Sequence, residues 1–155
     1  MYSTILVPLD GSGRAELILG HVEGLALKLG SKVILLRVIE PRRPIIDPHE
    51  SQVTTYLEEL QRREEQAKAY LLAKQGELRG MGIDTEIMLA SGPVVENIIN
   101  LAAEMDVSLI AMASHGRTGL ANVFYGGVAA GILNRVDRPL LLIRSRRDLP
   151  GDKVE

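Results

Sequence analysis

Apolar residues follow two alternating patterns along this chain. Short, nearly continuous apolar runs are typical of buried β-strands, whereas apolar positions three or four residues apart indicate amphipathic helices. The runs predict five strands, at residues 4–9, 33–39, 83–89, 107–113 and 140–143. The spaced positions predict helices between them, at residues 15–29, 53–78, 93–105 and 126–136. Strand and helix therefore alternate along the chain.

This alternation predicts a single α/β fold. Each strand–helix–strand unit forms a right-handed crossover, and successive crossovers build a parallel sheet with helices on both faces. Residues 83–89 alternate between apolar and polar side chains, so we place this third strand at an edge, where one face meets water. The prediction is a five-stranded, parallel, doubly wound, Rossmann-like sheet with strand order 3-2-1-4-5.

The helix at residues 53–78 is the longest predicted element. It follows a connection, residues 40–50, whose prolines prevent regular structure. Residues 58–65 are mostly charged and are expected to form a solvated face. The opposite face is an apolar stripe that we expect to be buried along its length, namely Val53, Leu57, Leu60, Ala67, Leu71 and Leu78.

The predicted strand order indicates where a ligand would bind. The winding direction reverses between strands 1 and 4, and open α/β sheets bind ligands outside the carboxyl ends of the strands at such a reversal. Strand 1 ends in Asp10-Gly11-Ser12-Gly13, and strand 4 is followed by the glycine-containing segment 114–119. These two loops form the candidate site.

The same order leaves the last strand at the other edge of the sheet. Its residues Leu140, Leu141, Leu142 and Ile143 are apolar on both faces, and an exposed apolar edge is an aggregation hazard for a monomer. Pairing with a second copy removes that hazard, so we expect a homodimer through this strand.

Composition narrows the functional classes. The length of 155 residues suits one domain, assigned to residues 1–146, with a polar tail at 147–155. The net charge of −2 gives no field that favours nucleic acid, and no run reaches the ~18 to 20 apolar residues of a membrane span. Cysteine is absent, which excludes disulfides and thiolate chemistry and fits the cytoplasm. The histidines lack metal-ligand spacing, so no metal site is expected.

The loop after strand 4 is the more informative of the two loops at the candidate site. Gly116, Gly119, Gly126 and Gly127 lie within a short stretch, and the last two begin a predicted helix. Backbone N–H groups at a helix start bind anions such as phosphate, and glycine permits close approach. Ordinary turn glycines are the alternative interpretation. His115 and Arg117 flank Gly116 and could also face a phosphate, although loop histidines are more often simply solvated.

Three segments resemble one known family. Residues 7–12 (VPLDGS) are similar to the opening of universal stress proteins, residues 109–120 (LIAMASHGRTGL) to their characteristic strand and loop, and residues 138–143 (RPLLLI) to their closing strand. The motifs occur in the family's order, and the resemblance covers about residues 4–144.

The resemblance implies a nucleotide site. The ATP-binding branch of the family carries Gly-x-x-Gly, nine residues, then Gly followed by Ser or Thr. That spacing falls here on Ala113, Gly116, Gly126 and Gly127, so the first and last residues depart from the pattern. The Ala113 methyl group is a potential steric conflict, and Gly127 lacks a hydroxyl that would bind phosphate.

The resemblance also assigns nucleotide contacts outside that pattern. Pro8 and Asp10 lie at the end of strand 1, Val38 near the end of strand 2, and Arg117 and Val128 beside the glycine motif. Asp10 has a second interpretation as a turn residue or a cap of the first helix.

The leading functional hypothesis is a regulatory module that binds an adenine nucleotide, ATP with or without Mg²⁺, and contacts unidentified proteins. No Walker lysine or nucleophile elbow is present, so at most slow hydrolysis is expected. The alternative is a nucleotide-independent dimeric stress protein, which the residues Ala113 and Gly127 favour. A third hypothesis is an adenine-nucleotide enzyme of the wider superfamily, which the loop at residues 10–13 suggests only faintly.

Overall fold

The computed structural model describes residues 1–41, 51–114 and 127–144, with only the backbone described for residues 51–53. The predicted connection after residue 41, most of the loop after strand 4 and the polar tail therefore lie outside the described residues. The elements are β1 (Thr4–Pro8), α1 (Gly13–Leu29), β2 (Lys32–Ile39), α2 (Ser51–Gly80), β3 (Thr85–Ser91), α3 (Val94–Glu104), β4 (Leu109–Ser114), α4 (Gly127–Arg135) and β5 (Leu140–Arg144).

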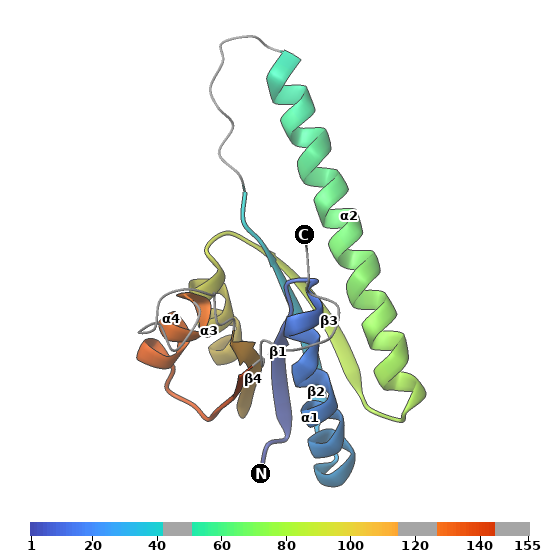
Figure 1. Cartoon of the computed structure of the whole chain (residues 1–155), viewed down its shortest axis with the longest axis vertical. Coiled ribbons are helices and arrows are strands. Elements are labelled where there is room, and N and C mark those ends of the chain that lie inside the picture. Colours follow the sequence, from blue (N-terminus) through green and yellow to red (C-terminus); the bar gives the residue numbers. More distant parts are fainter. Residues whose placement is uncertain (42–50, 115–126, 145–155) are drawn as a thin grey trace, which may run out of the picture.

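The sheet has the predicted topology. Its strands are parallel and follow the order β3-β2-β1-β4-β5, with β3 and β5 at the edges. Helices cover both faces (Figure 1): α1 and α2 lie on one, and α3 and α4 on the other. The doubly wound α/β fold is therefore confirmed.

Each face of the sheet has its own buried cluster. Successive side chains of a strand point to opposite faces, so each central strand supplies both clusters. The cluster under α1 and α2 includes Ile5, Val7, Val33, Leu35, Ile18, Val22, Leu71 and Leu78. The cluster under α3 and α4 includes Leu6, Ile34, Leu36, Ile110, Ile98, Ala102 and Ile132. This two-sided burial explains why β1, β2 and β4 read as nearly continuous apolar runs.

Local sequence determines where α1 begins and ends. The Ser12 side chain caps its start by accepting a hydrogen bond from the Ala15 N–H at 3.2 Å. Gly30 ends it with φ = +66°, a left-handed conformation that glycine adopts without steric cost. As a result, α1 starts directly after the loop at the carboxyl end of β1.

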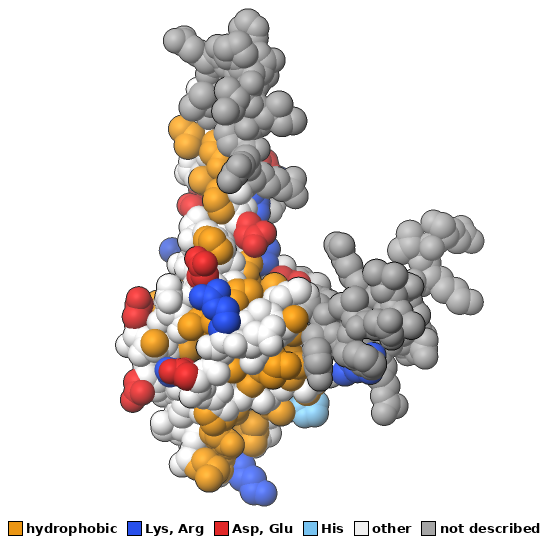
Figure 2. Space-filling model, turned by 90° about the vertical axis from the view of Figure 1, so that its left-hand side faces the viewer, with side chains coloured by type: hydrophobic (Ala, Val, Ile, Leu, Met, Phe, Trp, Pro, Cys, Tyr) orange, Lys and Arg blue, Asp and Glu red, His pale blue; other side chains and the backbone are white. Residues whose placement is uncertain are grey.

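The helix α2 corrects one prediction. Ala67, Leu71 and Leu78 are buried, as expected, but Leu57 is 56% exposed and Leu60 only half-buried. Figure 1 gives the reason: α2 runs antiparallel to the strands, and its first half extends beyond their carboxyl ends, where no sheet lies beneath it. Hydrophobic side chains are visible on this projecting part in Figure 2. The Val53 side chain lies outside the description.

The strand β3 starts two residues later than predicted but lies at the predicted edge. The alternation predicts that Met88 faces water with Asp84 and Glu86, and that Leu89 faces the other way with the apolar residues. In the structure Met88 packs into the cluster under α3, whereas Leu89 is 41% exposed. The face predicted to meet water is therefore only partly exposed, because α3 covers it at Met88 while the Glu86 side chain remains 46% exposed.

None of the helices in the described part of the chain is both long and apolar enough to cross a membrane.

Candidate functional site

The sheet changes its hydrogen-bonding pattern where its winding reverses. The pairing of β1 with β4 consists of Ile5 with Leu109 and Leu6 with Ile110. Towards their carboxyl ends, β1 continues to pair with β2 as far as Pro8, and β4 continues to pair with β5 as far as Ser114. The ladder between β1 and β4 thus ends before either strand does, which leaves backbone at the carboxyl edge outside the ladder.

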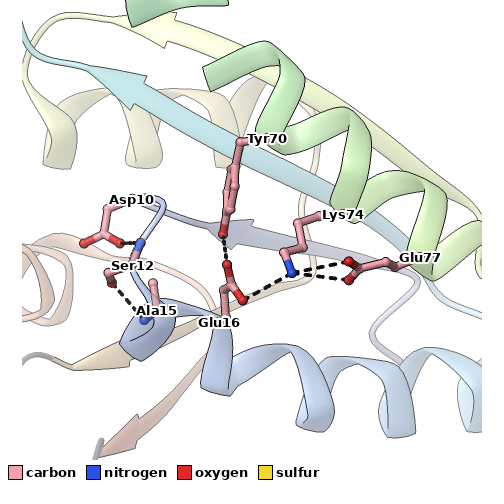
Figure 3. Close-up of polar contacts among 7 residues, drawn as sticks. All are labelled: Asp10, Ser12, Ala15, Glu16, Tyr70, Lys74 and Glu77. Carbon is pink, nitrogen blue, oxygen red and sulfur yellow. Dashed lines mark hydrogen bonds and ion pairs between the residues drawn. The ribbon is translucent and has the colours of Figure 1, made fainter. Parts of the chain in front are cut away.

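The loop after β1 is held by its own side chains. Asp10 Oδ1 accepts a hydrogen bond from the Ser12 N–H at 2.8 Å, which is an Asx turn, and Ser12 in turn caps α1 (Figure 3). Between them, Gly11 has φ = +85°, a conformation that a residue with a Cβ rarely adopts. Of the two structural interpretations of Asp10, turn residue or helix cap, the structure shows the turn residue, and Ser12 is the cap of α1.

The start of α1 is connected to α2 by the side chains of Glu16, Tyr70 and Lys74, none of which was predicted from the sequence. Glu16 lies in the first turn of α1, and its Oε1 accepts a hydrogen bond from the Tyr70 hydroxyl at 2.8 Å. Its Oε2 forms an ion pair with Lys74 Nζ at 3.2 Å. Lys74 also reaches Glu77 at 3.3 Å. The sequence signal that could have identified Glu16 is its position in the first turn of a predicted helix, where a negative charge interacts favourably with the helix dipole.

The environment of Tyr70 favours its neutral form. Burial, the hydrogen bond to Glu16 and the carboxylates of Glu16 and Asp10 raise the pKa of Tyr70 above its ordinary value of 10.0, while Arg37 opposes the shift. Burial lowers the pKa of Lys74, but its hydrogen bonds to Glu16 and Glu77 outweigh this, so that pKa is raised as well. Tyr70 therefore remains a donor and Lys74 a cation at neutral pH.

The second side of the site is formed by β4 and α4. Ala113 and Ser114 end β4 and are 8% and 2% exposed, respectively. Gly127 and Val128 begin α4 and are exposed. A Cβ added at Gly127 would have no heavy atom of the described residues within 4 Å. The other predicted residues of this loop, Gly116, Arg117 and Gly126, lie outside the described residues, as does His115.

Pro8 and Val38 lie on neighbouring strands at the same edge. Pro8 ends β1, and the next residue, Leu9, donates its N–H to the Leu36 carbonyl of β2 at 2.8 Å. Val38 is buried with Leu36 in the cluster under α3 and α4. Pro8, Val38, Ala113 and Gly127 thus lie on elements that end or begin at the carboxyl edge of the sheet, and Asp10 lies in the loop directly after β1.

This arrangement is suited to binding an anion. Both α1 and α4 begin near this edge, and helix starts offer backbone N–H donors with partial positive charge. Within residues 1–41, 51–114 and 127–144, no group of three or more His, Asp or Glu side chains could hold a metal ion.

Comparisons with known proteins agree with this fold. A family model described as the universal stress protein family matches residues 1–144. Universal stress protein MJ0577 of Methanocaldococcus jannaschii is 29% identical over 94% of this chain and 97% of its own length. Its solved structure superposes with a TM-score of 0.83, covering 96% of this chain and 99% of the other.

Two further structures contain nucleotides. A universal stress protein solved in complex with cAMP has a TM-score of 0.68 at 20% identity, covering 94% of this chain and 98% of its own. One from Archaeoglobus fulgidus, solved with dAMP, has a TM-score of 0.63 at 21% identity, covering 92% and 98%. At these identities the likeness establishes the shared fold.

Proposed function

Because this chain belongs to the universal stress protein family, we propose that it is a regulatory module of the stress response that binds an adenine nucleotide, ATP, at the carboxyl edge between β1 and β4. The observation that carries the proposal is the early end of the β1–β4 ladder, at the point where the winding reverses. The family relatives in complex with cAMP and dAMP support the choice of an adenine nucleotide.

The two sides of this edge have different roles in the proposal. Asp10, held by its Asx turn, and the backbone near Pro8 and Val38 contact the nucleoside. The start of α4, at Gly127 and Val128, binds phosphate through its N–H groups, together with Gly116, Arg117 and Gly126 from the preceding loop. Mg²⁺, where it takes part, arrives with ATP and is held by the phosphates.

Ala113 and Gly127 depart from the glycine pattern of the ATP-binding branch, but both are compatible with the binding of a nucleotide. Ala113 is almost completely buried within the fold, so its methyl group takes little space at the open edge. Gly127 lacks the hydroxyl of the family pattern but keeps its backbone N–H at the helix start. The loss of one hydrogen bond weakens binding by roughly 0.5–1.5 kcal/mol, which leaves a usable site.

Mass spectrometry of the ligand released from freshly purified, denatured protein tests the proposal. We expect an adenine nucleotide in a substantial fraction of the molecules. Protein that is purified empty and cannot be loaded by incubation with millimolar ATP would overturn the proposal and favour the second candidate, a nucleotide-independent dimeric stress protein.

The variant Gly127→Ser separates the two candidates further. It restores the hydroxyl of the family pattern at a position where no described heavy atom lies within 4 Å of the added Cβ. A nucleotide-binding protein should therefore gain affinity for ATP, by about two- to tenfold. Gly127→Ala is the matched control, because it adds a Cβ without a hydroxyl and should not produce this gain. A protein that works without nucleotide would show no ATP binding in any of the three forms.

We also propose a homodimer through β5. Among the described residues this edge strand pairs only with β4. Its residues Leu140, Leu141, Leu142 and Ile143 are half-buried. Light scattering after size exclusion should give twice the chain mass of 16.9 kDa, and a monomer at tens of micromolar would contradict the dimer.

A further inference from the structure

We propose that Tyr70 of α2 is a positioning residue for the nucleotide site, because it holds the loop that carries Asp10 in place through Glu16. The role in nucleotide binding rests on the function proposed above. The effect on the loop can be tested without any ligand.

The contact is made between two helices that pack on the sheet separately. Ile18 and Val22 dock α1, and Leu71 and Leu78 dock α2, all within the buried cluster of that face. The Tyr70 hydroxyl and the Lys74 ammonium group span the space between the helices and occupy both oxygens of Glu16 (Figure 3). Removing the hydroxyl therefore leaves the docking of both helices intact.

A continuous chain of hydrogen bonds leads from this contact to Asp10. The Glu16 side chain is bound by Tyr70 at 2.8 Å, and the Glu16 N–H donates to the Ser12 carbonyl at 3.3 Å. The Ser12 N–H then donates to Asp10 Oδ1 at 2.8 Å. The last two of these bonds belong to the first turn of α1 and to the loop before it. An anchor on Glu16 thus restrains the segment that orients the Asp10 carboxylate.

The contacts from α2 reduce the effect of the Glu16 charge at this edge of the sheet. An uncompensated carboxylate in the first turn of α1 would repel a phosphate at the same edge of the sheet. Lys74, with only 18% of its side chain exposed, pairs with this carboxylate and offsets part of its charge, because it also pairs with Glu77. The Tyr70 hydroxyl holds the second oxygen without adding charge. Glu16 is thereby held by two side chains of α2, which comes from a distant part of the sequence, and its charge is partly offset.

The variant Tyr70→Phe removes only the hydroxyl. Tyr56→Phe is the matched control, because Tyr56 lies on the projecting half of the same helix, away from Glu16. In ligand-free protein, amide exchange at Ser12, Ala15 and Glu16 should become about three- to tenfold faster in Tyr70→Phe and remain unchanged in Tyr56→Phe.

Amides of α3, such as that of Ile98, act as an internal reference. They lie on the opposite face of the sheet and should keep their exchange rates. Unchanged exchange in the loop would overturn the inference. An equal acceleration in α3 would overturn it as well, because the hydroxyl would then only contribute to global stability.

Calorimetric titration with ATP tests the second half of the inference. We expect the dissociation constant of Tyr70→Phe to be about three- to tenfold higher than those of wild type and Tyr56→Phe. Equal affinities would overturn the role in binding. A wild type that binds no ATP would refute the proposed function itself, while the exchange rates would still decide whether Tyr70 holds the loop.

Discussion

The two halves of α2 have the same helical geometry but different surroundings. In the second half, Leu71 and Leu78 are buried against the sheet, and Tyr70 and Lys74 reach α1. In the first half, Leu57 continues the same apolar stripe but is 56% exposed, because the helix has passed beyond the strands (Figure 1). One element thus combines a docked segment beside the candidate site with a projecting segment.

This difference shows that the spacing of apolar residues indicates which face of a helix is apolar, but does not indicate how far the sheet that covers this face extends. The hydrophobic contribution depends on the area removed from water, so identical leucines in the two halves contribute differently to stability. The docked half should respond strongly to mutation and the projecting half weakly.

The largest expected effect comes from Leu71→Ala. This side chain is fully buried, so its truncation should lower the free energy of unfolding by about 2–5 kcal/mol. Leu57→Ala makes the same chemical change in the projecting half and should alter it by no more than about 0.5 kcal/mol. Urea denaturation of both variants measures the difference. Similar losses would mean that the first half of α2 is covered in solution.

A smaller effect is expected from alkaline pH. The pKa of Tyr70 is raised in the folded protein, so its contribution to stability is fully present below the unfolded value near 10.0 and is lost as the pH rises above it. Wild type should therefore lose about 1 kcal/mol more than Tyr70→Phe between pH 9 and 11, since the group is partly exposed. Thermal unfolding at several pH values gives the two curves. Parallel curves would argue against the contact with Glu16.

The smallest effect is expected in the projecting half. Arg62 pairs with Glu59 at 2.6 Å, and both side chains are about half exposed. Solvent and salt screen such pairs, so Arg62→Ala should leave the urea midpoint within experimental error of wild type, at low and at high salt. A clear, salt-dependent decrease would indicate a network that involves more than this pair.

The fold could be predicted from the sequence because its signals are local. Continuous apolar runs marked the strands buried on both sides, and the alternation at residues 83–89 placed β3 at an edge. The strand order followed from these two features. What the local signals could not reveal was where the sheet ends beneath α2, so Leu57 was assigned to the core.

The candidate site could be predicted only in part. Asp10 and Gly127 were identified because they follow or begin predicted elements at one edge of the sheet. The contact of Glu16 with Tyr70 joins residues 54 positions apart, and no local pattern relates them. Ser12 was visible as a loop residue, but only the helix start identifies it as the cap.

Titration of stripped protein with ATP by calorimetry tests the central claim most directly, with Asp10→Ala as the site variant. Asp84→Ala is its control, because this exposed aspartate precedes β3 at the opposite end of the strands. We expect wild type and Asp84→Ala to bind ATP with equal affinity and Asp10→Ala to bind about tenfold more weakly or worse. No binding by wild type up to millimolar ATP, or equal affinity in Asp10→Ala, would contradict a nucleotide site between β1 and β4.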